Sequence, residues 1–295
     1  MLLSKIKIDA FKLASRPKTL PASVIPVLVG TSLAVYHDKF NGVAAVVALC
    51  CSVLIQVGTN YVNDLYDYLK GTDKADRVGP QRALASGLLS VKEMETGIFL
   101  VFGLSFLLGL YLVYLGGWWI LAVGVISILA GVAYTAGPYP LAYNGLGDIF
   151  VFIFFGFVAT VGTYYVQSLE INMFSFWISI PVGALITNIL VVNNYRDIEE
   201  DKNAGKFTLA VKIGARFTRV QYILLLIVSY LSLIVIYLNL KTNLMIFLPF
   251  LSLPVGINLI KMLFDNKGNE LNHTLELTAK FAGVFCVLLA IGIIV

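Results

Sequence analysis

Long apolar runs separated by short polar segments make up almost the whole chain. Nine runs have roughly the 20 residues that a helix needs to cross a bilayer. They are 19–36, 43–62, 96–115, 118–136, 148–168, 173–194, 220–239, 243–263 and 277–295. Thr96–Gly147 carries no charge and holds two of them, with Gly116 and Gly117 at the turn. The pattern predicts an all-α membrane protein, a bundle of nine transmembrane helices in one domain, residues 1–295.

The composition agrees with a chain that lies almost entirely in a membrane. Of its 295 residues, 59% are hydrophobic and 13% charged, whereas soluble domains carry about 25% charged residues. No continuous apolar core precedes Pro21, so we expect no cleaved signal peptide. Lys5, Lys12 and Arg16 can share one helix face, which predicts a short interfacial helix over residues 1–18. A disordered tail is the alternative.

The basic residues predict the orientation of the bundle. With the N-terminus in the cytoplasm, 19 of the 21 lysines and arginines fall on that side, and only Lys39 and Lys241 fall on the other. Such a bias is the positive-inside pattern of membrane proteins. The acidic residues divide in the same way, and most of the polar side chains lie in two loops, 63–95 and 195–219. We therefore expect these loops, after spans two and six, to form a cap on the cytoplasmic side.

The first of these loops begins with an acidic motif, Asn63–Arg77, directly after an apolar run. If the helix continues to Tyr68, four oxygen-bearing side chains share one of its faces. They are Asn60, Asn63, Asp64 and Asp67. Carboxylate and amide oxygens suit Mg²⁺, which proteins bind through one or two carboxylates together with substrate phosphates. The alternative is a solvated acidic loop that only ends a transmembrane helix.

A second acidic motif repeats part of the first. Val, Asn and Asp of Val62–Asp67 recur at the same positions in Val192–Asp197, four spans later and on the same side of the membrane. Asn193, Asp197 and Asp201 follow one another at intervals of four residues, on one helix face. Repeats of several spans are common in membrane folds, with sites at the repeat interface. The repeated motif therefore predicts that the bundle consists of two pseudo-equivalent four-helix halves.

Basic residues flank both motifs: Lys70, Lys74, Arg77 and Arg82 the first, Arg196, Lys202 and Lys206 the second. Two acidic helix ends that face one cavity would repel each other in a low-dielectric mouth. Mg²⁺ ions bridged by a diphosphate remove this repulsion, and neighbouring arginines and lysines stabilise charge on a departing phosphate. The alternative is that the basic residues only obey the positive-inside rule and hold no ligand.

The two motifs, NDLYDYLKGTD and DIEED, resemble those of the UbiA superfamily of intramembrane prenyltransferases. Four stretches resemble its bacterial branch that prenylates 1,4-dihydroxy-2-naphthoate in menaquinone synthesis: Arg16–Thr31, Gln56–Ser90, Gly137–Asp148 and Asn193–Gly214. The resemblance covers nearly the whole chain. It implies that a polyprenyl diphosphate, held through Mg²⁺, loses its diphosphate to give an allylic cation. The naphthoate ring attacks that cation and loses CO2.

The resemblance also implies site residues. It assigns Mg²⁺ and diphosphate to Asn63, Asp64, Asp67, Asp73, Asp197 and Asp201. Asp73 is a departure, because the superfamily pattern places its last aspartate where Gly71 stands. Diphosphate contacts fall to Arg77 and Lys206, then to Lys70 and Lys202, with Asn60, Arg82 and Asn194 also in the expected substrate site.

For five further residues the sequence leaves two interpretations, a role in the site or a role unrelated to it. Tyr134 and Tyr139 either shield the allylic cation with their ring faces or belong to an interfacial aromatic belt. Asp148 either acts behind the site or accepts a proton, or is only an acid favoured near a helix N-terminus. Arg16 and Lys18 meet either the naphthoate carboxylate or anionic lipid headgroups.

Two other functions compete with this one. A sibling enzyme would prenylate 4-hydroxybenzoate, homogentisate or haem with the same chemistry at the diphosphate. A secondary transporter of an anionic metabolite would place its polar residues near the bilayer midplane, whereas these spans are nearly free of charge. The expected partners are a polyprenyl diphosphate, an aromatic acceptor and lipid, and no nucleic acid. The expected location is the bacterial cytoplasmic membrane, with both loops in the cytoplasm.

Overall fold

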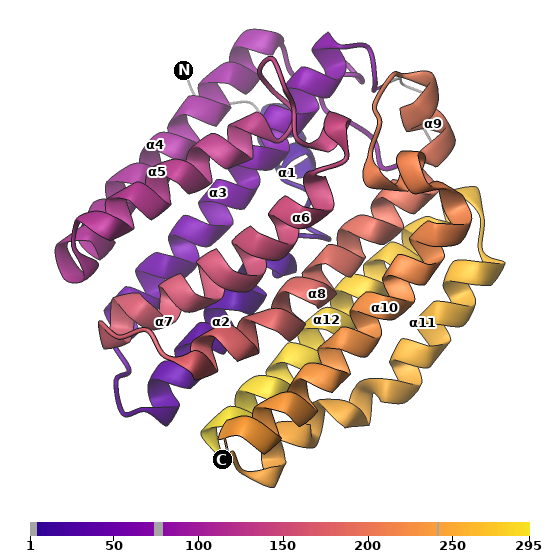
Figure 1. The fold of residues 1–295 in the computed structure, drawn as a ribbon. Helices are drawn as coiled ribbons and strands as arrows, with labels where there is room; N and C mark the ends of the chain where they lie inside the picture. The colour runs from indigo at the N-terminus through magenta and orange to yellow at the C-terminus, as the bar shows by residue number, and fades with distance from the viewer. Residues whose placement is uncertain (1–4, 74–78, 241) are drawn as a thin grey trace.

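The computed structural model describes residues 5–73, 79–240 and 242–295, and within these ranges the chain contains helices and no strands (Figure 1). In this described part of the chain, seven helical segments are long and apolar enough to span a membrane. They are Gly42–Leu69, Val91–Gly116, Gly147–Ser168, Met173–Arg196, Leu209–Leu240, Leu244–Asp265 and Gly268–Ile294. These confirm a multi-pass helical membrane protein, and each coincides with one of the nine expected spans.

The other two expected spans correspond to α2 (Pro21–Tyr36) and α5 (Trp118–Ala133), of 16 residues each. At 1.5 Å per residue each is about 24 Å long, shorter than the roughly 30 Å hydrocarbon core of a bilayer. The count of nine spans therefore stays a prediction.

The N-terminal part of the chain forms α1 (Lys5–Ala14), α2, α3 (Gly42–Leu69), α4 (Val91–Gly116) and α5. The turn between α4 and α5 lies at Gly117, as expected, where φ is +80°, a conformation that glycine adopts without strain. α4 begins with a capping box formed by Ser90 and Glu93. α3 has 28 residues and is about 42 Å long, so it continues well past its apolar run. The helix therefore includes Tyr68, and the condition for a shared face in the first motif is met.

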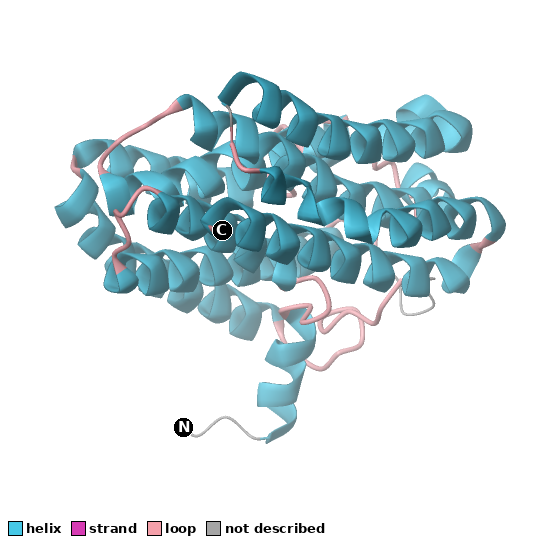
Figure 2. Ribbon diagram, turned by 90° about the horizontal axis from the view of Figure 1, so that it is seen from below, coloured by secondary structure: helices cyan, strands magenta, loops and turns pink. Residues whose placement is uncertain are grey.

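Of the helix expected over residues 1–18, the described residues show α1, Lys5–Ala14, and its interfacial position stays a prediction. α1 protrudes from the bundle next to the N-terminus in Figure 2, and its last turn packs on α3. There Ala10 and Ala14 are buried, and the hydroxyl of Tyr61 donates to the carbonyl of Phe11 at 3.2 Å. This contact fixes the chain that follows α1 against the polar end of α3.

The rest of the chain continues as η1 (Ala142–Asn144), α6 (Gly147–Val151), the π-helical η2 (Phe152–Ala159), α7 (Thr160–Ser168), α8 (Met173–Arg196), α9 (Ile198–Asn203), α10 (Leu209–Leu240), η3 (Leu244–Ser252), α11 (Leu253–Asp265), η4 (Gly268–Glu270) and α12 (Leu271–Ile294). α6, η2 and α7 form one continuous span. This span packs closely on α8, where Gly156 leaves no room for a side chain. A Cβ atom at this position would lie 2.9 Å from the backbone of both Gly183 and Ser179.

The helices form two groups with one span between them (Figure 1). α3 to α5 lie together on one side, α8 and α10 to α12 on the other, and α6–η2–α7 crosses between the two groups. α2 packs with the second group. The main apolar core joins α2, α8, α10 and α12 through side chains such as Leu33, Leu185, Leu233 and Phe285. α9 and the α5–α6 connection lie at the same end of the bundle. The two acidic motifs therefore meet at one end.

Candidate active site

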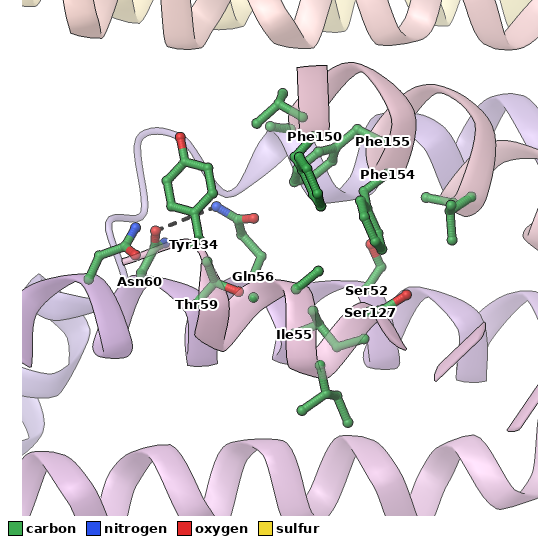
Figure 3. Close-up of a pocket in the computed structure, with 18 of the residues that line it drawn as sticks. Ser52, Ile55, Gln56, Thr59, Asn60, Ser127, Tyr134, Phe150, Phe154 and Phe155 are labelled. Atoms are coloured by element: carbon green, nitrogen blue, oxygen red, sulfur yellow. Dashed lines mark hydrogen bonds between the residues drawn. The ribbon is translucent and has the colours of Figure 1, made fainter. Parts of the chain in front are cut away.

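A cavity of about 360 Å³ lies between the two groups of helices, and both acidic motifs contribute to its wall. Its polar wall includes Arg16, Gln56, Asn60, Asn63, Asp67, Asp73, Arg82, Tyr134, Asn193, Asn194, Asp197, Glu200, Asp201 and Lys206. Its apolar wall comes mainly from α3, α4, α5 and α6–η2, with further residues from α2, α7 and α8. In Figure 3, Gln56, Asn60 and Tyr134 gather at one end, and Phe150 and Phe154 face Ile55 across the cavity.

The two parts of the cavity fit the two parts of an amphiphilic ligand. Lining residues of α3 extend from Ala48 to Asp67, about 28 Å along the helix axis. Phe150 and Phe154, one helical turn apart, stack with their ring centroids 5.9 Å apart. The cavity therefore consists of an apolar channel, which includes Phe150 and Phe154, and a charged mouth, which is formed by the charged side chains of the polar wall.

Asp67 lies at the centre of the charged mouth and is buried. The hydroxyl of Tyr143 donates to its Oδ1 at 2.8 Å, and Lys206 Nζ lies 3.4 Å from its Oδ2. The same Nζ is 3.7 Å from Asp201 Oδ1, so Lys206 bridges the two motifs. Burial lowers the pKa of Lys206, but Asp67 and Asp201 outweigh it and raise that pKa above its ordinary value. Lys206 is therefore a stable cation between two carboxylates.

Asp197 is held by its neighbour Arg196 in a bidentate pair. Arg196 Nε donates to Oδ1 at 2.6 Å and Nη2 donates to Oδ2 at 2.7 Å. The same guanidinium also donates to Asn193 Oδ1 at 3.0 Å and to Asn272 Oδ1 on α12 at 2.7 Å. Because the arginine fork matches carboxylate geometry, this arrangement fixes Asp197 at the end of α8.

Asp64 has a different environment from the other motif residues. Its side chain is 1% exposed and is not part of the cavity wall. Its Oδ2 accepts the backbone N–H of Ala83 at 3.0 Å, and its Oδ1 accepts that of Leu84 at 3.2 Å. Arg82, the residue before Ala83, pairs with Asp73 at 2.9 Å in the cavity wall. Asp64 thus anchors the loop that carries Arg82.

The donor set of the mouth fits a hard divalent cation. Asn63, Asp67, Asp73, Asp197 and Asp201 all contribute to the wall, and carboxylate and amide oxygens are the ligands that Mg²⁺ prefers. Within the described ranges, no three acidic, histidine or cysteine side chains are close enough together to hold a metal ion by themselves. The carboxylates of Asp67 and Asp197 instead face Lys206 and Arg196. A cation bound here would therefore share its coordination with a ligand such as phosphate.

The remaining expected site residues divide between wall and surroundings. Asn60, Asn194, Arg82, Arg16 and Tyr134 line the cavity. Lys70 lies behind the wall, donating to the carbonyl of Thr135 at 2.8 Å. Outside the wall are Lys202, which is exposed; Tyr139, which is 62% exposed; Lys18, which pairs with Glu276 at 2.9 Å; and Asp148, whose Oδ1 accepts from Gln221 Nε2 at 2.9 Å. Arg77 lies outside the described residues.

Three residues that the structure places at the site escaped sequence reasoning. Gln56 lines the cavity and donates to Asn60 Oδ1 at 3.5 Å, and the hydroxyl of Thr135 donates to Asn63 Oδ1 at 2.8 Å. Tyr143 bonds Asp67, as described above. Burial, followed by the charge of Asp67, raises the pKa of Tyr143, so it is a neutral donor. Tyr143 lies within Gly137–Asp148, a stretch that carried the family resemblance, and this was the available signal.

Most of the chain matches a known protein family: the model of the UbiA prenyltransferase family covers residues 23–291. The chain belongs to the UbiA prenyltransferase family. It is 39% identical over 225 residues to the 1,4-dihydroxy-2-naphthoate octaprenyltransferase of Haemophilus influenzae, covering 74% of this chain and 73% of that one. It is 32% identical over 282 residues to the enzyme of the same name from Bacillus subtilis, covering 95% and 91%.

Solved structures share the fold of this UbiA family member. A UbiA homolog from Archaeoglobus fulgidus bound to GPP and Mg²⁺ superimposes with a TM-score of 0.69 at 17% identity, covering 97% of this chain and 99% of that one. The apo structure of a UbiA homolog from Aeropyrum pernix K1 gives the same TM-score at 14% identity, covering 99% and 98%. The expected membership of the UbiA superfamily is confirmed.

Proposed function

We propose that the chain transfers a polyprenyl group from a polyprenyl diphosphate to 1,4-dihydroxy-2-naphthoate, with release of diphosphate and CO2, to give demethylmenaquinol, the reduced form of demethylmenaquinone. The observation that carries the proposal is the single cavity that joins an apolar channel to a mouth formed by both acidic motifs. An amphiphilic prenyl diphosphate matches both parts. The names of the relatives from Haemophilus influenzae and Bacillus subtilis support the naphthoate acceptor.

The metal assignment follows the geometry of the mouth. We assign Mg²⁺ to the oxygens of Asn63, Asp67, Asp197 and Asp201, with Asp73 beside them, because all five line the cavity. Bound there, Mg²⁺ would supply Lewis-acid stabilisation of the departing diphosphate. Lys206 and Arg82 lie in the same wall and are placed to contact the phosphates. We assign Asp64 to loop anchoring, since its two oxygens are taken by Ala83 and Leu84.

The acceptor end of the cavity involves Arg16 and Tyr134. Arg16 lines the cavity whereas Lys18 pairs with Glu276 outside it, so Arg16 is the cation placed to meet a carboxylate of the acceptor. Arg16 adopts φ +54°, a conformation that is unfavourable for a residue with a side chain. Tyr134 also lines this cavity, and the face of its aromatic ring would stabilise the allylic cation that forms when the diphosphate leaves.

The topology completes the proposal. We place the mouth on the cytoplasmic side, because the lysines and arginines divide 19 to 2 between the two sides. We also assign two pseudo-equivalent halves, since α3 and α8 each end in an acidic motif at the same cavity. The 16-residue helices α2 and α5 would then be the remaining two of nine spans.

The test is a prenylation assay with the purified protein in lipid vesicles. Dihydroxynaphthoate, a polyprenyl diphosphate and Mg²⁺ are supplied, and both prenylated product and CO2 are measured. We expect product and CO2 in equal amounts, loss of both with EDTA, and recovery with excess Mg²⁺. Parallel reactions contain 4-hydroxybenzoate or homogentisate as acceptor. Faster prenylation of either of these would overturn the naphthoate assignment, and turnover in EDTA would overturn the metal assignment.

A further inference from the structure

Tyr143 connects three segments that are far apart in the sequence. It lies in η1, in the connection between α5 and α6. Its hydroxyl donates to Asp67 Oδ1 at 2.8 Å and is 2.7 Å from Thr72 Oγ1, both in the first motif. Its backbone carbonyl accepts the N–H of Phe207, which follows the second motif, at 3.2 Å. One residue of this connection therefore contacts both the first motif and the segment that follows the second.

The direction of the hydrogen bonds at Tyr143 follows from the groups involved. An ionised carboxylate only accepts, so the single hydroxyl proton of Tyr143 is donated to Asp67. The hydroxyl oxygen can then only accept from Thr72, whose proton completes the chain. Successive bonds of this kind polarise and strengthen one another. The Asp67 carboxyl group is thereby fixed in one orientation, with Oδ1 turned toward Tyr143.

This orientation leaves Oδ2 as the atom that Asp67 offers to the cavity. Its contact with Lys206 is long, 3.4 Å. Asp67 lines the cavity, whereas Tyr143 is not part of the wall. Tyr143 therefore acts on the site through Asp67 and not by touching a ligand in the cavity. Such residues behind a metal ligand fix its geometry and typically change metal affinity 10- to 100-fold when mutated.

The Tyr143 ring also organises two cations. Lys70 Nζ lies 4.0 Å from the ring centroid and Lys206 Nζ lies 5.4 Å from it, both within cation–π range. The connection itself is held against the start of α10, because Lys212 donates to the carbonyl of Asn144 at 2.6 Å. The ring and the hydroxyl of Tyr143 thus have separate roles. Tyr143→Phe would keep the ring beside the two lysines and remove the hydrogen bond to Asp67.

We propose that Tyr143 is a positioning residue for metal binding, which orients Asp67 so that Oδ2 faces the metal. This inference rests on the proposed function, in that it requires a divalent cation in the mouth. It adds a group from outside both aspartate-rich motifs to the machinery of the site.

The experiment measures binding of Mn²⁺, an EPR-visible substitute for Mg²⁺, to the purified protein in the presence of inorganic diphosphate. The variants are Tyr143→Phe, Thr72→Val and, as matched control, Tyr68→Phe, an exposed tyrosine next to Asp67 on α3. We expect Tyr143→Phe to weaken Mn²⁺ binding 10- to 100-fold. Thr72→Val should weaken it less, about threefold to tenfold, because Tyr143 keeps its bond to Asp67. Tyr68→Phe should bind as the wild type does.

Two further readouts separate positioning from a loss of structure. The thermal midpoint of the metal-free protein should be similar in Tyr143→Phe and wild type, and kcat at saturating Mg²⁺ should largely recover. Unchanged Mn²⁺ affinity in Tyr143→Phe would overturn the proposal. If that variant does not fold, unchanged affinity in Thr72→Val overturns it instead. Absence of Mn²⁺ binding to the wild type would overturn the metal site itself, whereas binding without naphthoate prenylation would overturn only the acceptor.

Discussion

Asp64 offers the sharpest test of how the first motif works, because the structure separates its role from that of Asp67. Both residues are buried carboxylates on α3, three residues apart. Asp67 lines the cavity, whereas the oxygens of Asp64 accept the N–H groups of Ala83 and Leu84. We therefore predict that Asp64→Asn disturbs the loop and spares the metal, and that Asp67→Asn does the reverse.

The magnitude follows from the two hydrogen bonds. A hydrogen bond to a charged group contributes about 1.5–3 kcal/mol, and an unpaired buried donor costs about 1–3 kcal/mol. Because Asp64 is 1% exposed, water does not screen or replace these bonds. Asparagine keeps one acceptor oxygen, so Asp64→Asn should lose one of the two bonds, about 1.5–3 kcal/mol. This corresponds to a rise of about 10- to 100-fold in the population in which the loop is open.

The assay is hydrogen–deuterium exchange of the segment that contains Ala83 and Leu84, combined with Mn²⁺ binding in the presence of diphosphate. We expect Asp64→Asn to speed exchange of this segment about 10- to 100-fold. It should leave Mn²⁺ affinity within about threefold of the wild type, less than the change typical of a residue behind a metal ligand. Activity should fall, since Arg82 loses its fixed position beside Asp73. Unchanged exchange together with a loss of Mn²⁺ binding as large as that of Asp67→Asn would refute the anchoring role.

Three further predictions concern the mouth and the packing. Asp67→Asn and Asp197→Asn should abolish product formation while the protein still inserts and folds, as judged by size-exclusion chromatography; substantial turnover would count against the metal assignment. Lys206→Gln removes the cation between the motifs and should raise KM for the prenyl diphosphate about 10- to 100-fold, equivalent to about 1.4–2.8 kcal/mol; an unchanged KM would exclude a phosphate contact. Gly156→Val should destabilise the bundle by about 1–3 kcal/mol, because its side chain meets the backbone of α8, whereas Gly283→Ala, with open space around it, should leave the thermal midpoint unchanged.

Much of the fold could be predicted from local pattern. The lengths of the apolar runs located all seven long helical spans, and the two glycines after Leu115 located the turn between α4 and α5. The spacing of Asn60, Asn63 and Asp67 placed their oxygens on one face on condition that the helix continues past its apolar run. α3 does continue, and all three residues line the cavity. These predictions succeeded because they depend on helix period and bilayer thickness alone.

The contacts that organise the mouth lie beyond local pattern. Asp64 shares its motif and spacing with Asp67, and only the tertiary path of the loop to Ala83 separates their roles. Tyr143 is 76 positions from Asp67, and the resemblance of its stretch, Gly137–Asp148, does not identify it as the partner of a carboxylate. Arg196 was read as a flanking charge, although it forms the bidentate pair with Asp197. Each of these assignments needed the position of a side chain relative to a distant segment.

The ion pairs of the mouth bear on how it can receive a charged substrate. A buried carboxylate requires a partner, and Asp67, Asp73 and Asp197 have Lys206, Arg82 and Arg196. If Asp67 exchanges its contact with Lys206 for a metal, the carboxylate stays neutralised and the lysine becomes available to a phosphate oxygen. The 3.4 Å contact between Asp67 and Lys206 is longer than a charge-assisted hydrogen bond of about 2.7–2.9 Å, so among these three pairs it is the one that opens at least cost. Metal and diphosphate should therefore bind cooperatively at Lys206, whereas Arg196, held by four hydrogen bonds, should stay in place.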